Sequence, residues 1–175
     1  MKILVSACLL GRNCKYSGGN NLNEKVVAFV EGHEVIEVCP EVAAGLGIPR
    51  TPIEIVDGVL MDRNGHSVDA ALRKAVADIL EKLPADIDCA VLQSRSPTCG
   101  VDQIYDGTFS GKRIPGSGVF AEALKDAGYK VLDAEDVPMM AVEKLMSEVC
   151  KGWASVRDEA DWISEEEAYD RISKI

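Results

Sequence analysis

Three of the six cysteines lie at or just beyond the end of a short apolar segment of the kind that forms a buried strand. Cys8 follows residues 3–5, Cys39 follows residues 35–38, and Cys99 lies one short loop beyond residues 89–92. In a parallel sheet, ligands bind outside the carboxyl ends of the strands. We therefore expect these three thiols to come together at one edge of a sheet.

Three converging thiolates suit a soft metal site with one open position. Zinc would keep its fourth position for chemistry, and a [4Fe–4S] cluster would keep one iron without a protein thiolate. A zinc ribbon or ferredoxin is excluded, because those sites use C-x-x-C pairs and the chain contains none. A metal-free thiol nucleophile and simple core cysteines stay open as alternatives. Neither G-x-G-x-x-G nor a P-loop motif occurs, so a dinucleotide or P-loop site has no support.

The other three cysteines are predicted separately. Cys89 begins an apolar segment and Cys150 ends an amphipathic one, and both are interpreted as core residues. Cys14 lies in a polar loop near Cys8, where an exposed thiol, a redox partner and an extra ligand all stay open.

The elements that must position these cysteines alternate along the chain. Strands are expected over residues 2–6, 34–38, 88–92 and 129–132, with helices at about 24–31, 68–83 and 118–127. This alternation predicts an α/β fold with a mostly parallel sheet flanked by helices, in a Rossmann-like three-layer arrangement. Asp57-Gly58 between two apolar runs predicts an inserted β-hairpin. Residues 101–118 are expected to be a long, glycine-rich functional loop.

The 175 residues are enough for one domain with a proper core. We expect an α/β core over 1–133 and a helical C-terminal extension over 134–175, where the composition becomes acidic. No signal peptide or apolar run of about 18 residues begins the chain, which predicts a cytoplasmic protein in which structural disulfides are uncommon. The net charge of −10 argues against nonspecific nucleic-acid binding and against a membrane surface, since both present anionic phosphates.

Five motifs occur in order along the chain. They are Ser6-Ala7-Cys8-Leu9-Leu10-Gly11, Cys39-Pro40-Glu41 with Gly45-Leu46 and Pro49-Arg50-Thr51-Pro52, Ser96-Pro97-Thr98-Cys99-Gly100, Ile104-Tyr105-Asp106-Gly107-Thr108-Phe109, and Gly116-Ser117-Gly118-Val119. This set and its order resemble the DUF523 family, whose characterised members are thiouracil desulfurases. The resemblance runs from about residue 2 to residue 133. The tail after it is too short for the DUF1722 domain of many members, so the stand-alone form is expected.

The resemblance implies a [4Fe–4S] cluster held by Cys8, Cys39 and Cys99. The remaining iron would bind the sulfur of a small thiolated nucleobase such as 2-thiouracil, and water would replace that sulfur on the ring without net redox. Glu41 and Ser96 stand at the family's catalytic positions. A general acid/base and a hydrogen-bond donor are what replacing C=S by C=O requires.

Each of these residues also has a purely structural interpretation. Glu41 could be a solvated carboxylate at a helix start, and Ser96 could be a turn residue. Arg50 and Arg95 could attract an anionic group or pair with acidic residues.

Two more residues could line a substrate pocket, and two alternative functions stay open. Ser6 and Ser94 are polar residues at strand ends that could line a substrate pocket. The alternative functions are a three-cysteine metal- or sulfur-binding protein without turnover, holding zinc for example, and a metal-free thiol redox protein.

Overall fold

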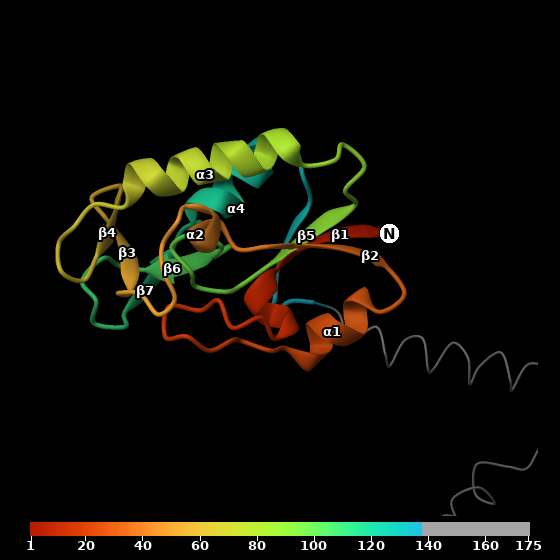
Figure 1. Ribbon diagram of the computed structural model, residues 1–175, viewed down its shortest axis with the longest axis horizontal. Coiled ribbons are helices and arrows are strands. Elements are labelled where there is room, and N and C mark those ends of the chain that lie inside the picture. Colours follow the sequence, from red (N-terminus) through yellow and green to blue (C-terminus); the bar gives the residue numbers. More distant parts are fainter. Residues whose placement is uncertain (138–175) are drawn as a thin grey trace, which may run out of the picture. The chain divides into compact units, whose positions relative to one another are not determined.

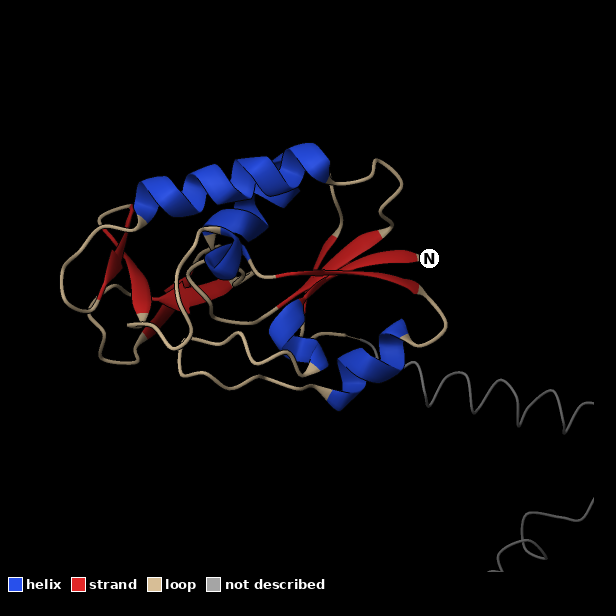
Figure 2. Cartoon of the chain, in the orientation of Figure 1, coloured by secondary structure: helices blue, strands red, loops and turns tan. Residues whose placement is uncertain are grey.

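The computed structural model describes residues 1–137, and its centre is a four-stranded parallel sheet (Figures 1 and 2). The strand order is β2-β1-β5-β8. The chain passes from β1 to β2 on one side of β1, and then from β2 to β5 on the other side of β1. The order in which strands are added to the sheet therefore reverses between β1 and β5. This confirms the predicted α/β fold. The strands are β1 (Lys2–Ser6), β2 (Glu34–Val38), β5 (Cys89–Leu92) and β8 (Val131–Asp133).

Helices cover both faces of the sheet (Figure 1). On one face lie α3 (Asp69–Lys82) and α4 (Val119–Asp126), and on the other lie η1 (Ala7–Leu10), a 3₁₀ helix, and α1 (Glu24–Val30). Because both faces are covered, the inner strands are apolar throughout and their side chains alternate between two cores. Leu4 packs with Leu72 and Phe120 in the first core, whereas Ile3 packs with Val26 in the second.

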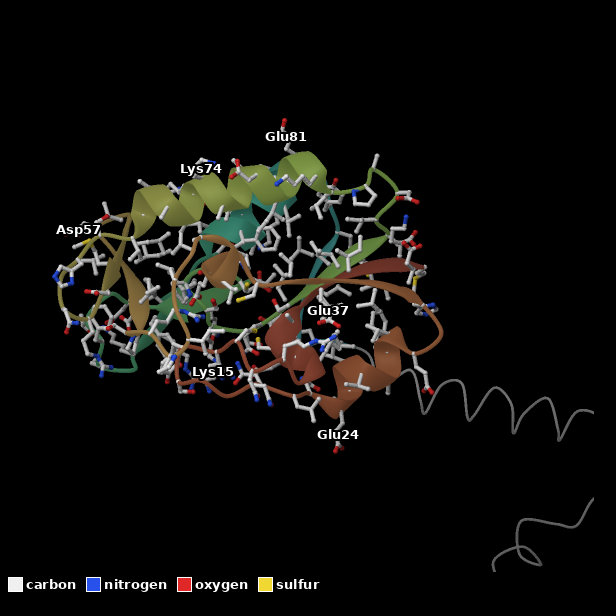
Figure 3. All side chains as sticks on the ribbon, in the orientation of Figure 1. Lys15, Glu24, Glu37, Asp57, Lys74 and Glu81 are labelled. Carbon is white, nitrogen blue, oxygen red and sulfur yellow. The ribbon has the colours of Figure 1, made fainter. Side chains whose placement is uncertain are left out.

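The predicted helices are confirmed to within a few residues. Asn23 caps α1, accepting hydrogen bonds from the backbone N–H groups of Lys25 and Val26. The charged side of α3 faces outward, as Lys74 and Glu81 show (Figure 3). The short helix α2 (Pro40–Ala43) begins with a proline, which is readily accommodated in the first turn of a helix.

Two antiparallel hairpins lie side by side beyond the carboxyl ends of the sheet (Figure 1). The hairpin of β3 (Ile53–Val56) and β4 (Val59–Asp62) confirms the prediction, with Asp57 and Gly58 both at positive φ as the tight turn requires. A second hairpin joins β6 (Gln103–Tyr105) and β7 (Arg113–Pro115). The prediction of a loop without strands over 101–118 was therefore wrong, because strands of three residues are too short to show a period.

Most of the predicted C-terminal extension lies outside the described residues, as does Cys150. None of the helices within residues 1–137 is long and apolar enough to cross a membrane.

Candidate active site

A cavity of about 470 Å³ opens between the carboxyl ends of the parallel strands and the two hairpins. This volume lies in the range that small-molecule sites occupy, and the cavity lies next to the point where the chain changes direction across the sheet. Two sides of it are distinguished by their origin. The sheet wall comprises Cys8, Cys14, Cys39, Glu41, Ser96 and Cys99, and the hairpin wall comprises Glu54, Arg63, Tyr105 and Phe109.

The structure brings the three predicted cysteine ligands to this one cavity. Cys8 lies in η1, directly after β1, and the side-chain amide of Asn21 lies 3.8 Å from its sulfur. Cys39 is the N-cap of α2, directly after β2. Burial raises the pKa of the Cys8 thiol, and the Asn21 hydrogen bond partly offsets that effect.

Cys99 lies in a turn that Ser96 organises. The hydroxyl oxygen of Ser96 accepts hydrogen bonds from the backbone N–H groups of Thr98 and Cys99, each at 3.1 Å. Burial raises the pKa of the Cys99 thiol well above its usual value, although a hydrogen bond with Ser6 acts in the opposite direction. The turn role expected for Ser96 is therefore present. The Ser96 oxygen is the acceptor in both of these hydrogen bonds, so neither of them uses the hydroxyl proton.

The first turn of α4 holds this loop in place. The backbone N–H of Val119 donates to the carbonyl of Pro97, and that of Phe120 donates to the carbonyl of Thr98. Gly118 allows this approach, because a Cβ there would lie 2.5 Å from the carbonyl carbon of Thr98. The position of Cys99 thus depends on helix α4 as well as on strand β5.

Glu41 is held between a cation and a hydroxyl. Its Oε2 is 2.7 Å from the Arg50 guanidinium, and its Oε1 accepts a hydrogen bond of 3.0 Å from Thr98. The side chains of Glu41 and Arg50 are only 15% and 9% exposed. The interpretation of Glu41 as a solvated carboxylate was therefore wrong, and the expected pairing of Arg50 with an acidic residue is confirmed.

Ser6 and Ser94 are both buried in the lining of the cavity. The Ser6 oxygen accepts a hydrogen bond from the backbone N–H of Gln93, which ties β1 to the end of β5. The Ser94 hydroxyl donates to Asp133 at the end of β8. Their described hydrogen bonds thus join neighbouring strands at the base of the cavity.

Cys14 is a fourth thiol in the sheet wall. It is 8% exposed, so it is not the exposed thiol that the polar loop allowed. Burial raises its pKa to about 12, with further contributions from Cys39 and Cys8. The Cys39 thiol donates a hydrogen bond of 4.0 Å to the backbone carbonyl of Cys14. The same carbonyl accepts a hydrogen bond of 2.9 Å from Arg50. By contrast, Cys89 is 5% exposed within the apolar core, as predicted.

The donor chemistry of this cavity fits an iron–sulfur cluster, because cysteine thiolates are the ligands of such clusters. Cys8, Cys39 and Cys99 all line this one cavity, each beyond the end of a different parallel strand. Within residues 1–137, no three His, Cys, Asp or Glu side chains form a group that could hold a single metal ion.

The sequence profile of the 2-thiouracil desulfurase family matches residues 3–136. The chain belongs to this family. YbbK, an uncharacterized protein of Bacillus subtilis (strain 168), is 36% identical over an alignment of 146 residues, and the match covers 77% of this chain and 97% of YbbK. The solved structure of the [4Fe-4S]-dependent thiouracil desulfidase TudS (DUF523Vcz) is 32% identical, with a TM-score of 0.73, and the match covers 83% of this chain and 98% of TudS. The DUF523 resemblance is confirmed.

Two functional candidates of this desulfurase-family chain were not singled out from the sequence. Thr98 is completely buried and donates to Glu41, but beside Cys99 its hydroxyl had no distinguishing feature. Glu54 is 7% exposed in the hairpin wall. It stands between Ile53 and Ile55, where simple alternation would place a charged side chain in solvent. The signal available for Glu54 was its position two residues after the Pro-Arg-Thr-Pro motif.

Proposed function

We propose that this chain is a [4Fe–4S]-dependent desulfurase that converts the C=S group of a small thiolated nucleobase, such as 2-thiouracil, to C=O without net redox. The observation that carries the proposal is the placement of Cys8, Cys39 and Cys99 in one cavity beside Glu41 and Ser96. Membership of the 2-thiouracil desulfurase family supports the same reaction.

In this proposal Cys8, Cys39 and Cys99 are the cluster ligands. Their thiol protons leave when the metal binds, because the thiolate is the ligand. When bound, the cluster would supply an iron without a protein thiolate, a soft Lewis acid suited to the sulfur of the substrate. Cys89, on the opposite end of β5, has no part in the site.

Glu41 and Ser96 carry the proton chemistry. The overall change is C=S plus water to C=O plus hydrogen sulfide, so the attacking water must lose a proton while the ring must be held. Glu41, paired with Arg50, accepts the proton from water. The Ser96 hydroxyl donates a hydrogen bond to a heteroatom of the ring, and this bond stabilises the charge that develops there. Ser6 and Ser94 shape the base of the cavity against which the ring lies.

A thiol redox pair is the second candidate function. The observation that favours it is the hydrogen bond of 4.0 Å from the Cys39 thiol to the backbone carbonyl of Cys14, which brings these two cysteines together in the cavity. A redox protein would form a reversible disulfide and would need no iron.

Anaerobic purification followed by analysis for iron, acid-labile sulfide and zinc tests the proposal. We expect a brown protein with about four irons and four sulfides per chain, which converts 2-thiouracil to uracil and releases sulfide. Colourless protein containing zinc would contradict the cluster. Cluster-loaded protein that leaves 2-thiouracil and other thiolated pyrimidines unchanged would contradict the reaction while the cluster assignment stood.

A further inference from the structure

Glu54 places a buried carboxylate in the hairpin wall of the cavity that the cysteines also line. It belongs to β3, and its side chain is 7% exposed. Its Oε2 accepts a hydrogen bond of 3.0 Å from the backbone N–H of Phe109, in the loop between β6 and β7. This bond holds the two hairpins together at the cavity.

The second oxygen of Glu54 remains available to a ligand. Oε1 makes no hydrogen bond or ion pair with any of residues 1–137. Every fully buried side-chain N or O atom in that range does have a hydrogen-bond partner, so Oε1 is not one of the fully buried atoms. Oε1 therefore keeps contact with solvent. Because Glu54 lines the cavity and is otherwise buried, that solvent is the water of the cavity.

A buried carboxylate in this position destabilises the folded protein unless it binds a partner. Burying a charge without a cationic partner is unfavourable, and the backbone N–H of Phe109 alone does not neutralise it. The cation of the hairpin wall is Arg63, whose guanidinium lies over the Phe109 ring at 5.7 Å and forms no ion pair with Glu54. A carboxylate oxygen that faces the cavity in a largely buried setting is a strong acceptor for an N–H donor.

We propose that Glu54 is a specificity-determining residue that accepts a hydrogen bond from a ring N–H of the bound pyrimidine. This inference rests on the proposed function, because it assumes that a nucleobase occupies the cavity with its sulfur toward the sheet wall. It assigns the hairpin wall to recognition of N–H donors. Pyrimidines methylated on the ring nitrogens would bind poorly on this account.

Glu54→Gln tests the direction of the proposed hydrogen bond. The amide oxygen of the glutamine can still accept the hydrogen bond from Phe109, so the loop keeps its anchor. The amide nitrogen then faces the cavity, and an acceptor becomes a donor at nearly unchanged shape. Glu37→Gln on β2 is the matched control, because Glu37 pairs with Arg12 on the surface and does not line the cavity.

Binding of uracil and 1,3-dimethyluracil to the anaerobically purified chain, measured by calorimetry, gives the readout. We expect wild-type protein and Glu37→Gln to bind uracil at least about 10-fold more tightly than Glu54→Gln does. The affinity for 1,3-dimethyluracil, which has no ring N–H, should change less than about threefold. A matched loss for both ligands, or no loss for uracil, would overturn the assignment.

Two further results separate this inference from the proposed function. If wild-type protein bound both pyrimidines equally, the ring N–H groups of uracil would not contribute to its affinity. The inference would then fail whether or not Glu54→Gln folds. If the chain lacked iron and released no sulfide while Glu54→Gln still lost uracil selectively, the desulfurase proposal would fail and the Glu54 assignment would stand.

Discussion

The two walls of the cavity are built in different ways. In the sheet wall, Cys8 and Cys39 directly follow parallel strands, and Cys99 lies in a loop bound to the first turn of α4. In the hairpin wall, Glu54 and Phe109 come from two short antiparallel hairpins that are joined by one side-chain hydrogen bond. The sheet wall is thus built at the ends of the parallel strands, whereas the hairpin wall is built from separate antiparallel strands, of which the first hairpin packs Ile53 and Leu60 into the same core.

This difference separates reactivity from recognition. Groups that carry chemistry must be held to within a fraction of an ångström, and strands and helices of a core provide that. Binding residues are often placed on loops, which can change without loss of the fold. We therefore expect changes in the sheet wall to remove the cluster or turnover, and changes in the hairpin wall to alter affinity.

The largest effect is expected for Cys99→Ala, compared with Cys89→Ala. Both cysteines are buried beside the same strand, but only Cys99 lines the cavity. Cys99→Ala should lose most of the iron and the visible absorbance after anaerobic purification, and Cys89→Ala should keep both. Full iron content in Cys99→Ala would remove this cysteine from the proposed ligand set.

The second effect tests how far α4 fixes the sheet wall. Gly118→Ala puts a methyl group 2.5 Å from the carbonyl carbon of Thr98, so the loop or the helix must move. We expect the free energy of unfolding to fall by roughly 2 kcal/mol or more, measured with denaturant. Gly19→Ala is the control, because its new Cβ would lie 3.9 Å from the nearest atom, the Ser17 hydroxyl oxygen. Equal stability of the two variants would show that the close contact at Gly118 is not needed.

Thr98→Val should reduce turnover more than stability. The valine has nearly the shape of threonine, but it cannot donate to Glu41. Losing a hydrogen bond to a charged group should lower kcat about 10-fold with little change in KM or iron content. Thr98→Ser keeps the hydroxyl and should keep most of the activity. In a Glu41→Gln background the further loss from Thr98→Val should vanish, and an undiminished loss there would mean that Thr98 does not act through Glu41.

The smallest effect is expected in the hairpin wall. Arg63→Met removes the cation over the Phe109 ring, a contact that contributes about 0.5–1 kcal/mol when exposed. Unfolding by denaturant should show a loss of that size, and iron content and kcat should be unchanged. Lys25→Met on α1 is the control for removing an exposed cation. If Arg63→Met lost the cluster, the two walls would not be separable.

The framework of the fold could be predicted because its signals are local. An apolar run such as residues 3–5 is buried on both faces and forms a strand wherever it stands. Asp57-Gly58 adopts the positive φ values of a tight turn without help from distant residues. The β6–β7 hairpin was missed for the opposite reason: its three-residue strands depend on pairing with each other and on contact with β3.

The network around Glu41 could not be predicted in the same way. Arg50 follows Glu41 by nine positions, and Thr98 by 57. Both pairings depend on how α2 is placed against the end of β5, which no local pattern specifies. The burial of Glu54 likewise depends on the second hairpin covering the first.

From the sequence alone, it was determined that three cysteines follow three strands of a parallel sheet, and hence that they meet at one edge. The physical reason is that strand propensity and side-chain alternation are short-range, and parallel strands end together. Only the tertiary structure decided that Cys14 is buried beside Cys39, that Thr98 and Arg50 hold Glu41, and that Glu54 lines the same cavity as the cysteines. These contacts join residues far apart in the chain, and they exist only once strand order and hairpin packing are set.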